Sequence, residues 1–211
     1  MDKKPSLIIF DFDGTIAKTI EPLFEIVNNL SEEYKINRIT KEMAARIREE
    51  GPREIIKESG VSYWRLLFLV NRIKRELGKI IENVHVVENL PNQLQQLKAS
   101  GCTLGIITSD SRDNVERFLK RKEIFHFFDF IYPGAGIWGK GPIIRKALRK
   151  KKLQATDAVY VGDEIRDIKA AREANVKVIS VCWGFNTANA LQKNNPDHLI
   201  HEPDELIKIL C

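Results

Sequence analysis

Apolar residues along this chain gather in short unbroken runs, separated by longer segments in which they recur at helical spacing. The clearest runs are 7–10 (LIIF), 103–108 (TLGIIT), 158–162 (AVYVG) and 177–182 (KVISVC), with a weaker one at 128–133 (FDFIYP). Continuous rather than alternating runs are typical of strands in a parallel sheet that is covered on both faces. We therefore expect these runs to be buried parallel strands.

The segments between the later runs predict helices. In residues 90–101 three leucines share one helical face, and Gly101 follows as a C-terminal stop signal. Residues 112–122 and 164–175 have the same pattern. Strand and helix thus alternate from residue 90 onward, which predicts an α/β fold with a doubly wound parallel sheet.

Residues 17–85 interrupt that alternation, because they contain no convincing strand. Apolar residues recur at helical spacing in three stretches, 21–36, 41–50 and 63–81. We interpret this segment as an all-helical cap domain inserted after the first strand, with residues 1–16 and 86–211 forming the α/β core. An insertion at this place would cover the end of the first strand as a lid does.

Composition sets limits on the partners. The chain has 211 residues, 43% of them hydrophobic, and a net charge of +5. Lysine and arginine are interleaved with glutamate, and the densest basic cluster, 145–152, has the pattern of the solvated C-terminal end of a helix. We therefore expect no nucleic-acid partner, and infer from the charge only a modest attraction for anionic substrates.

The three cysteines, Cys102, Cys182 and Cys211, have no metal-binding spacing and are interpreted as reduced thiols. The apolar run at 7–10 is too short for a secretion signal, and no run approaches the ~18 residues of a membrane span. The sequence therefore predicts a cytoplasmic protein without a membrane partner, and leaves the oligomeric state open between monomer and dimer.

Polar residues follow the predicted strands at their carboxyl ends, where functional groups collect in an open parallel sheet. In chain order they are Asp11 and Asp13, Thr108 and Ser109, Lys140, and Asp163 and Asp167. Asp11 and Asp13 are two residues apart, so in an extended backbone both would face the same side. Four strand ends therefore offer carboxylate, hydroxyl and ammonium groups to one crevice.

These residue types suit phosphoryl transfer. Clustered carboxylates resist joint ionisation unless a cation such as Mg²⁺ compensates their charge. One carboxylate can attack phosphorus to form an aspartyl-phosphate, and a second can protonate the leaving alkoxide and then deprotonate water. A hydroxyl and an ammonium group can hold the phosphoryl oxygens.

Each residue also has an ordinary structural explanation. The first pair of aspartates could fill a turn, and Glu164 with Asp167 could stabilise the first turn of a helix. Thr108 and Ser109 could cap the helix that follows them. Lys140 alone suggests an exposed lysine. Their joint occurrence at four strand ends favours a functional site over these separate structural roles.

Four segments, in this order, resemble the successive motifs of the haloacid dehalogenase-like (HAD) hydrolase superfamily: DFDGT (11–15), IITSDS (106–111), Lys140 in GKGP, and GDEIRD (162–167). The resemblance covers the whole chain and implies a Rossmann-like core. The helical insertion is similar to the C1 cap of the subgroup that contains phosphoglycolate phosphatase and β-phosphoglucomutase. Residues 181–206 are also similar to phosphoglycolate phosphatase-like members.

The resemblance implies a role for each carboxylate. Asp11 would be the nucleophile and a Mg²⁺ ligand, and Asp13 would be the general acid and base, with its carbonyl oxygen also on the metal. Asp163 would bind the metal, and Asp167 would complete the acidic cluster, either on the metal or behind its ligands. An acid at Asp13, which the dehalogenase branch lacks, argues for phosphoryl transfer.

The resemblance also implies a phosphate site. Thr108 would bind the phosphoryl oxygens with the help of the Ser109 amide, and Lys140 would steady both the nucleophile and the phosphate. Gly14 belongs to the same set, and would let the chain turn sharply between sheet and cap.

The chain departs from the family pattern at several positions. Lys18 and Thr19 stand where many cap-bearing relatives have Asp-Ser, and Asp110 stands where Asn is frequent. Glu164 replaces a common Ser or Thr, and would either tighten metal binding or cap the helix. The first change concerns the cap hinge, so it bears on the substrate more than on the chemistry.

Substrate choice would lie in the cap. Arg53 could meet a substrate carboxylate such as that of phosphoglycolate, or could be an exposed arginine. Residues 182–186 and Trp138 could line the cleft or pack beside it. Trp64 and Phe68, at helical spacing, are interpreted as part of the cap core rather than as a platform for the substrate.

We therefore predict a Mg²⁺-dependent phosphatase that hydrolyses a small phosphorylated metabolite, similar to phosphoglycolate, through an aspartyl-phosphate at Asp11. A sugar-phosphate mutase on the same scaffold and a catalytically idle binding protein are the alternatives. A phosphoryl-accepting signalling domain uses similar groups at strand ends, but needs neither a helical lid nor an acid at Asp13.

Overall fold

Leu7–Phe10 (β1) forms the centre of a parallel sheet in the computed structural model, which describes residues 4–51, 63–134 and 139–211. The six strands lie in the order β3-β2-β1-β4-β5-β6. The others are β2 (Thr103–Ile107), β3 (Phe130–Tyr132), β4 (Ala158–Gly162), β5 (Lys177–Val181) and β6 (His198–Ile200). Every strand predicted from the sequence is therefore present, and β6 is an additional edge strand.

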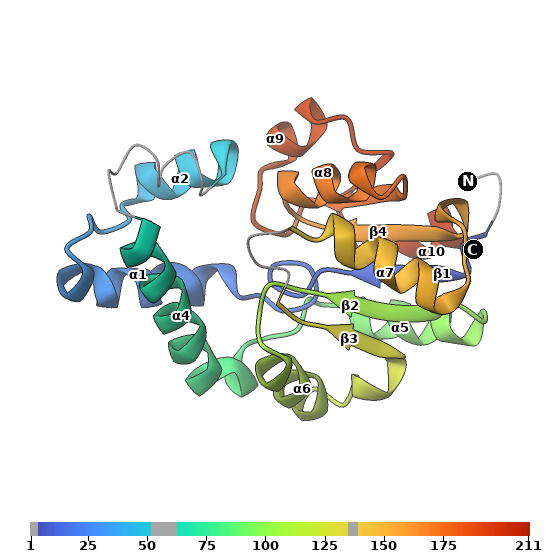
Figure 1. Ribbon diagram of the computed structural model, residues 1–211, viewed down its shortest axis with the longest axis horizontal. Coiled ribbons are helices and arrows are strands. Elements are labelled where there is room, and N and C mark those ends of the chain that lie inside the picture. The colour runs from blue at the N-terminus through green and yellow to red at the C-terminus, as the bar shows by residue number, and fades with distance from the viewer. Residues whose placement is uncertain (1–3, 52–62, 135–138) are drawn as a thin grey trace.

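Helices cover both faces of this sheet (Figure 1). One face carries α5 (Leu90–Ala99), α6 (Arg112–Arg121) and α10 (Glu205–Leu210), which pack with Ile8 and Phe10 of β1. The other face carries α7 (Gly141–Lys151), α8 (Ile165–Glu173) and α9 (Ala188–Lys193), which pack with Leu7 and Ile9. Alternate residues of β1 thus enter two separate apolar layers, which confirms the doubly wound α/β fold.

The register of the sheet brings the strand ends to one level. Phe10, the last residue of β1, pairs with Ile106 of β2 on one side and with Val161 of β4 on the other. The residues that follow these three therefore emerge at the same edge of the sheet. This edge is where an open α/β sheet binds its ligands.

The predicted helical cap is present between β1 and α5. Its described helices are α1 (Ile20–Tyr34), α2 (Lys41–Glu50) and α4 (Tyr63–Ile80), followed by a 3-10 turn at Ile81–Asn83. Figure 1 shows α1 and α4 crossing beside the α/β core, with α2 above them. Shorter 3-10 turns at Phe125–Phe127 and Ala155–Asp157 belong to the core.

The two passages of the chain between sheet and cap lie side by side. Ala17 forms isolated β-bridges with Asp13 and with Val86. The domain boundaries predicted from the sequence, at residues 17 and 85, lie at this crossing and stay a prediction.

The interpretation of Phe68 as cap core is wrong, because its side chain is 68% exposed. Leu69, Ile73 and Leu77 form the apolar stripe of α4, at spacings of four residues, and they pack into the core. Phe68 precedes this stripe by one position and therefore faces solvent. The side chain of Trp64 lies outside the described residues.

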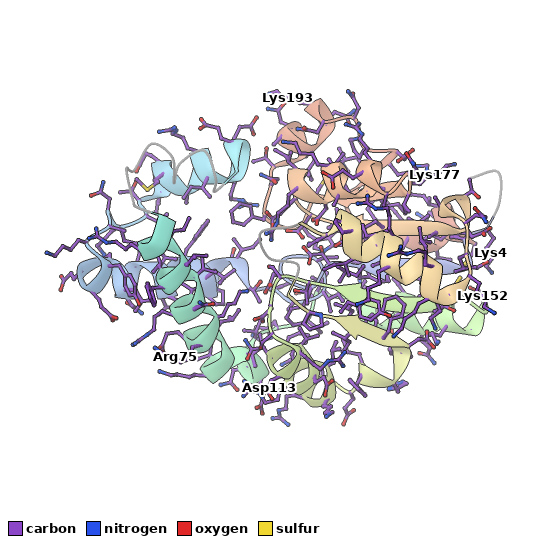
Figure 2. The ribbon with its side chains drawn as sticks, viewed as in Figure 1. Lys4, Arg75, Asp113, Lys152, Lys177 and Lys193 are labelled. Atoms are coloured by element: carbon purple, nitrogen blue, oxygen red, sulfur yellow. The ribbon has the colours of Figure 1, made fainter. Side chains whose placement is uncertain are left out.

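Basic side chains are spread over the surface. Figure 2 shows Lys4, Lys152, Lys177 and Lys193 at separate places on the α/β core, and Arg75 on α4. The densest basic cluster, 145–152, forms the C-terminal part of α7 and its cap, as predicted. In the described part of the chain, no helix is long and apolar enough to cross a membrane. All three cysteines are free thiols.

Candidate active site

The chain beyond β1 places Asp11 inside the molecule. The backbone N–H of Asp11 donates to the carbonyl oxygen of Val161 at 2.8 Å, so the pairing with β4 continues to this residue. The side chain of Asp11 is buried, and Asp13 is partly exposed as a residue although its Oδ1 atom is shielded from solvent. Between them Phe12 packs edge-on against Phe118 of α6, with ring centroids 5.2 Å apart. This packing anchors the strand end that carries both carboxylates.

Lys140 bridges two of the predicted site carboxylates. Its Nζ atom lies 2.5 Å from Oδ2 of Asp11 and 2.6 Å from Oδ1 of Asp167. The residue directly precedes α7, and only 3% of it is exposed. The alternative of an exposed surface lysine is therefore wrong, and the ammonium group is held by two buried anions.

Asp163 and Asp167 come from the end of β4 and the first turn of α8, and converge on Asp11. One oxygen from each of the three carboxylates lies within 4.8 Å of the others. The second oxygen of Asp167 accepts the backbone N–H of Glu164 at 3.1 Å, so this residue also caps α8. Asp167 therefore caps α8 with one oxygen and contacts Lys140 with the other.

Asp163 is fixed by groups that the sequence did not point to. Its Oδ1 accepts a hydrogen bond from the Thr15 hydroxyl at 2.6 Å, and its Oδ2 accepts the backbone N–H of Phe185 at 2.7 Å. Thr15 lies in the recognised DFDGT segment, but Phe185 is more than twenty positions from Asp163. Such a contact between distant segments is set by the fold and leaves no local signal.

Two glycines let the backbone pass close to the Asp163 side chain. A Cβ atom on Gly14 would lie 2.2 Å from Oδ2 of Asp163, and Gly14 has φ +77°. A Cβ atom on Gly184 would lie 2.0 Å from Cβ of Asp163. Real Cβ atoms do not approach heavy atoms so closely, so both positions require glycine for the carboxylate to remain where it is.

Thr108 and Ser109 follow β2 at the same edge of the sheet. Thr108 is buried, and its hydroxyl accepts the backbone N–H of Asp110 at 2.9 Å. The alternative that these two residues cap the next helix is wrong, because Ser111 is the N-cap of α6 and accepts the backbone N–H of Asn114. The carbonyl oxygen of Ser109 accepts Nζ of Lys74, from α4 of the cap, at 2.5 Å.

The buried carboxylates hold their protons more tightly than free carboxylates do. Burial raises the pKa of Asp11 to about 6, although the charge of Lys140 opposes the effect. Burial, with Asp110 and Asp11 nearby, raises the pKa of Asp13 to about 8. Burial and neighbouring carboxylates, Asp11 first among them, also raise the pKa of Asp163 well above its usual value. The protein's own cations thus leave the cluster with unbalanced negative charge.

The donor set suits a hard divalent cation. Asp11, Asp163 and Asp167 present only carboxylate oxygens, which are the ligands that Mg²⁺ prefers. In the described part of the chain, Lys140 is the cation that pairs with two of these three carboxylates, Asp11 and Asp167. A divalent ion between them would relieve the repulsion that raises their pKa values.

A loop of the core, residues 183–187, joins Asp163 to the cap. Arg48, in the last turn of α2, donates from Nε to the carbonyl oxygen of Phe185 at 3.0 Å and from Nη2 to that of Gly184 at 3.2 Å. In return, the Asn186 side chain and the Thr187 backbone donate to the carbonyl oxygen of Arg48. The cap helix and the Asp163 carboxylate therefore hold opposite sides of one loop.

Neighbouring contacts extend this interface. The carboxylate of Glu49 accepts hydrogen bonds from the hydroxyl of Thr187, from Asn189 and from Lys193. Trp183 donates its indole N–H to the carbonyl oxygen of Thr15 at 3.2 Å. Residues 182–186 are expected to line the site or to pack beside it. Phe185, within this segment, contacts Asp163 directly.

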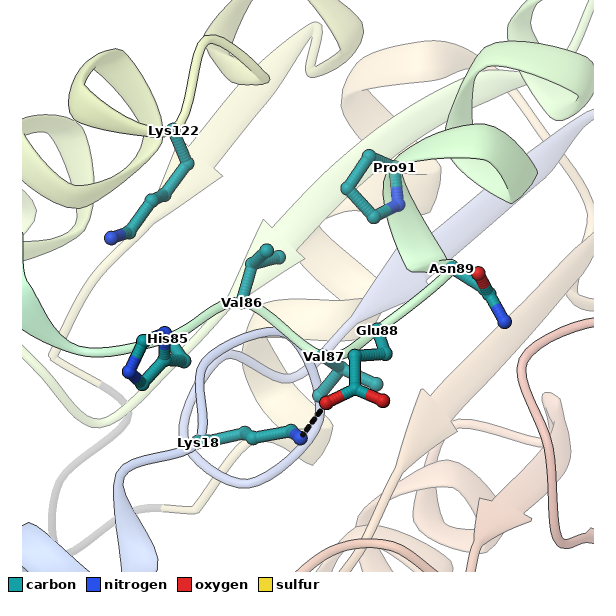
Figure 3. A pocket seen from close by; sticks show the side chains of 8 residues that line it. All are labelled: Lys18, His85, Val86, Val87, Glu88, Asn89, Pro91 and Lys122. Atoms are coloured by element: carbon teal, nitrogen blue, oxygen red, sulfur yellow. Dashed lines mark hydrogen bonds and ion pairs between the residues drawn. The ribbon is translucent and has the colours of Figure 1, made fainter.

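Other predicted positions lie away from these contacts. Lys18 forms an ion pair with Glu88 at 3.1 Å, in a surface pocket where the two passages between sheet and cap run (Figure 3). Among the described residues, the lining of this pocket includes His85 and Lys122 but none of the predicted site residues. Arg53 and Trp138 lie outside the described residues.

Comparison with known proteins relates this geometry to a family. A family model described as haloacid dehalogenase-like hydrolase matches residues 8–181. A phosphoglycolate phosphatase of Synechococcus elongatus is 31% identical over 201 residues, which is 95% of each chain. A pyrophosphatase, PpaX, of Bacillus velezensis is 27% identical, covering 99% of this chain and 97% of its own. A solved structure of a haloacid dehalogenase-like family hydrolase from Streptococcus pneumoniae is 25% identical, with a TM-score of 0.80 and 98% and 99% of the two chains covered.

Proposed function

The chain belongs to the haloacid dehalogenase-like hydrolase family, and we propose that it is a Mg²⁺-dependent phosphatase of small phosphorylated metabolites. The observation that carries this proposal is the convergence of three buried carboxylates with Lys140 at the carboxyl edge of the sheet. A cluster of this kind is costly to a fold, because each buried charge must be compensated. Its presence at the ligand-binding edge is therefore best explained by chemistry.

In this proposal Asp11 is the nucleophile. One of its oxygens forms a bond to phosphorus as the bond between phosphorus and the ester oxygen breaks, which leaves an aspartyl-phosphate and an alkoxide. The reaction requires Asp11 to be ionised. The ammonium of Lys140, 2.5 Å away, favours the ionised form against the effect of burial.

Asp13 is the general acid and base. With a pKa raised to about 8, its carboxyl group is mostly protonated near neutral pH and can give a proton to the leaving alkoxide. The resulting carboxylate then takes a proton from water as that water attacks phosphorus. Phosphate leaves, and both aspartates return to their first state.

Asp11, Asp163 and Asp167, with the backbone carbonyl of Asp13, would hold the divalent cation. When bound, the cation supplies positive charge that offsets the carboxylates and the phosphoryl oxygens. Thr15 and the backbone of Phe185 orient Asp163 toward the cluster.

The phosphoryl group would be held by Thr108, Ser109, Lys140 and the turn at Gly14. Thr108 and Ser109 follow β2, next to β1 in the sheet, so they flank the nucleophile. Hydroxyl, amide and ammonium donors fixed before substrate arrives stabilise developing charge at no cost of reorganisation.

Phosphoglycolate is the first substrate to test, since a relative that covers 95% of the chain is a phosphoglycolate phosphatase. Inorganic pyrophosphate is a second candidate, because PpaX pyrophosphatases cover nearly the whole chain at lower identity. Both are small, and both carry a second anionic group beside the reacting phosphoryl group.

The test is phosphate release from a panel of small phosphate compounds, with Mg²⁺ or with a chelator. We expect release that needs the metal and that Asp11→Asn abolishes. Asp113→Asn, an exposed residue on α6, is the matched control and should retain activity. A sugar isomer formed without free phosphate would support the mutase instead, and no turnover of any compound by folded protein would favour a binding role.

A further inference from the structure

Arg166 occupies a position that local electrostatics disfavours. It lies in the first turn of α8, where the unpaired N–H groups of a helix present positive charge and cations are destabilising. The N-cap, Glu164, and Asp167 in the same turn are anions, as this position prefers. A cation placed among them calls for an explanation beyond the stability of the helix.

The guanidinium group is held on one side and open on the other. Nη2 of Arg166 pairs with Oε1 of Glu164 at 2.5 Å, and Glu164 itself is buried. The Nε atom of Arg166 is inaccessible to solvent and has no hydrogen-bond partner among the described residues. The side chain as a whole nevertheless remains 40% exposed. A guanidinium group that one carboxylate fixes and that still remains partly exposed is suited to receive a second anion.

The first turn of α8 places Arg166 beside the reactive carboxylates. Asp167, the next residue, presents an oxygen within 4.8 Å of one from Asp11. The positive charge of Arg166 lowers the pKa of both Asp11 and Asp13, against the larger effect of their burial. Arg166 therefore lies close enough to the reacting end of the site for a small substrate to span the distance.

Three other cations near this edge of the sheet, within residues 4–51, 63–134 and 139–211, already contact protein groups. Lys140 is shared between Asp11 and Asp167. The cap contributes Lys74, which donates to the carbonyl oxygen of Ser109, and Arg48, which donates to two carbonyl oxygens of the loop 183–187. The ammonium of Lys140 thus faces the reacting carboxylates, and the two cap cations hold the cap against the core.

We propose that Arg166 is a specificity-determining residue that binds a second anionic group on the leaving part of the substrate. This rests on the proposed phosphatase function. The group is a carboxylate or a phosphoryl group, since both match the planar fork of a guanidinium. Glu164 holds the fork in place before the substrate arrives, so that little conformational freedom is lost on binding.

The experiment compares two monoesters that differ in one group. Phosphoglycolate carries a carboxylate where 2-hydroxyethyl phosphate carries a neutral CH₂OH, and the reacting phosphoryl group is the same. We expect Arg166→Met to lower kcat/KM for phosphoglycolate at least about ten-fold more than for 2-hydroxyethyl phosphate, mainly through a higher KM. Arg166→Lys should recover part of the preference, because it keeps the charge but not the fork.

Lys169→Met is the matched control, since Lys169 is an exposed cation on the same helix. It should leave the ratio between the two substrates unchanged. Inorganic pyrophosphate is the third substrate in the comparison. Its second anionic group is a phosphoryl group, so its kcat/KM against that of phosphoglycolate shows which second anion is preferred.

The outcomes separate this inference from the proposed function. Equal losses on both monoesters in Arg166→Met, or equal rates on both with the unmodified protein, would overturn the role of Arg166 while the phosphatase function stands. If the unmodified protein releases phosphate from none of the compounds, the function itself fails and the inference fails with it.

Discussion

The Nζ atom of Lys140 lies 2.5 Å from Oδ2 of Asp11, and both side chains are almost completely buried. Lys140→Met would leave Asp11 and Asp167 as uncompensated buried anions. Breaking a buried ion pair from one side typically costs ~3–5 kcal/mol. We expect a decrease in the free energy of unfolding of this size in urea titrations of the metal-free protein, together with a large fall in kcat.

The control for this variant is Lys146→Met, which removes an exposed lysine from α7. It should change neither quantity measurably. If the Lys140→Met protein were as stable and as active as the unmodified protein, this ion pair would be needed for neither stability nor catalysis.

The stability of the metal-free protein should decrease as pH rises from about 5 to about 8. Asp13 has a pKa of about 8 in the folded protein against 3.8 in the unfolded chain, so within this range the folded state holds a proton that the unfolded state has released. Unfolding then releases protons, and rising pH favours it. Thermal unfolding in a chelator at several pH values measures the effect.

Two comparisons sharpen this pH experiment. Asp13→Asn removes the titrating group, so the decrease in melting temperature between pH 5 and pH 8 should become smaller. Added Mg²⁺ should raise the melting temperature most at the higher pH, where the carboxylates are ionised. A melting temperature that rises with pH in chelator would exclude this explanation.

Gly184→Ala should weaken metal binding although it replaces none of the proposed ligand residues. The added methyl group would lie 2.0 Å from Cβ of Asp163, so the loop or the carboxylate must move. Disturbing the support of a metal ligand typically costs about 10–100-fold in affinity. Calorimetric titration with Mg²⁺ measures this loss directly. Gly101→Ala, where a Cβ atom meets nothing within 4 Å, is the control and should leave the affinity for Mg²⁺ unchanged.

Arg48→Met should loosen the contact between α2 and the core. The side chain donates hydrogen bonds to the carbonyl oxygens of Gly184 and Phe185, and methionine can make neither. We expect faster hydrogen exchange at the amides of residues 184–187 and a several-fold higher KM. Arg46→Met, which removes an exposed arginine of the same helix, should have no such effect on exchange. Unchanged exchange in Arg48→Met would mean that the cap is held by other contacts.

Much of the fold could be predicted because the strands are continuous apolar runs. Residues 7–10 and 158–162 match β1 and β4 at both ends, since every residue in them is buried and the next residue is polar or charged. The edge strand β6 and the short helices α9 and α10 were not predicted. Each has only three to six residues, too few to establish a period.

Residues of the candidate site could be predicted only where a chemically suitable side chain stands next to the end of a strand or helix in the sequence. Asp11, Asp163 and Lys140 directly follow or precede regular elements, so their convergence follows from the parallel sheet. The support of Asp163 by Phe185, and of the loop by Arg48, joins segments that are distant in sequence. Such contacts depend on how α2 approaches the core, which no local pattern of residues determines.

The bridges that join Ala17 to Asp13 and to Val86 have a consequence for how this protein could have diversified. The chain departs from the sheet and rejoins it at almost one point, so everything between can lengthen, shorten or be exchanged without changing the order of the strands. Asp11 and Asp13 precede this junction and Asp163 and Asp167 follow it, whereas the helical cap lies between its two passages. Selection could therefore remodel the cap while the reacting carboxylates keep their places at the strand ends.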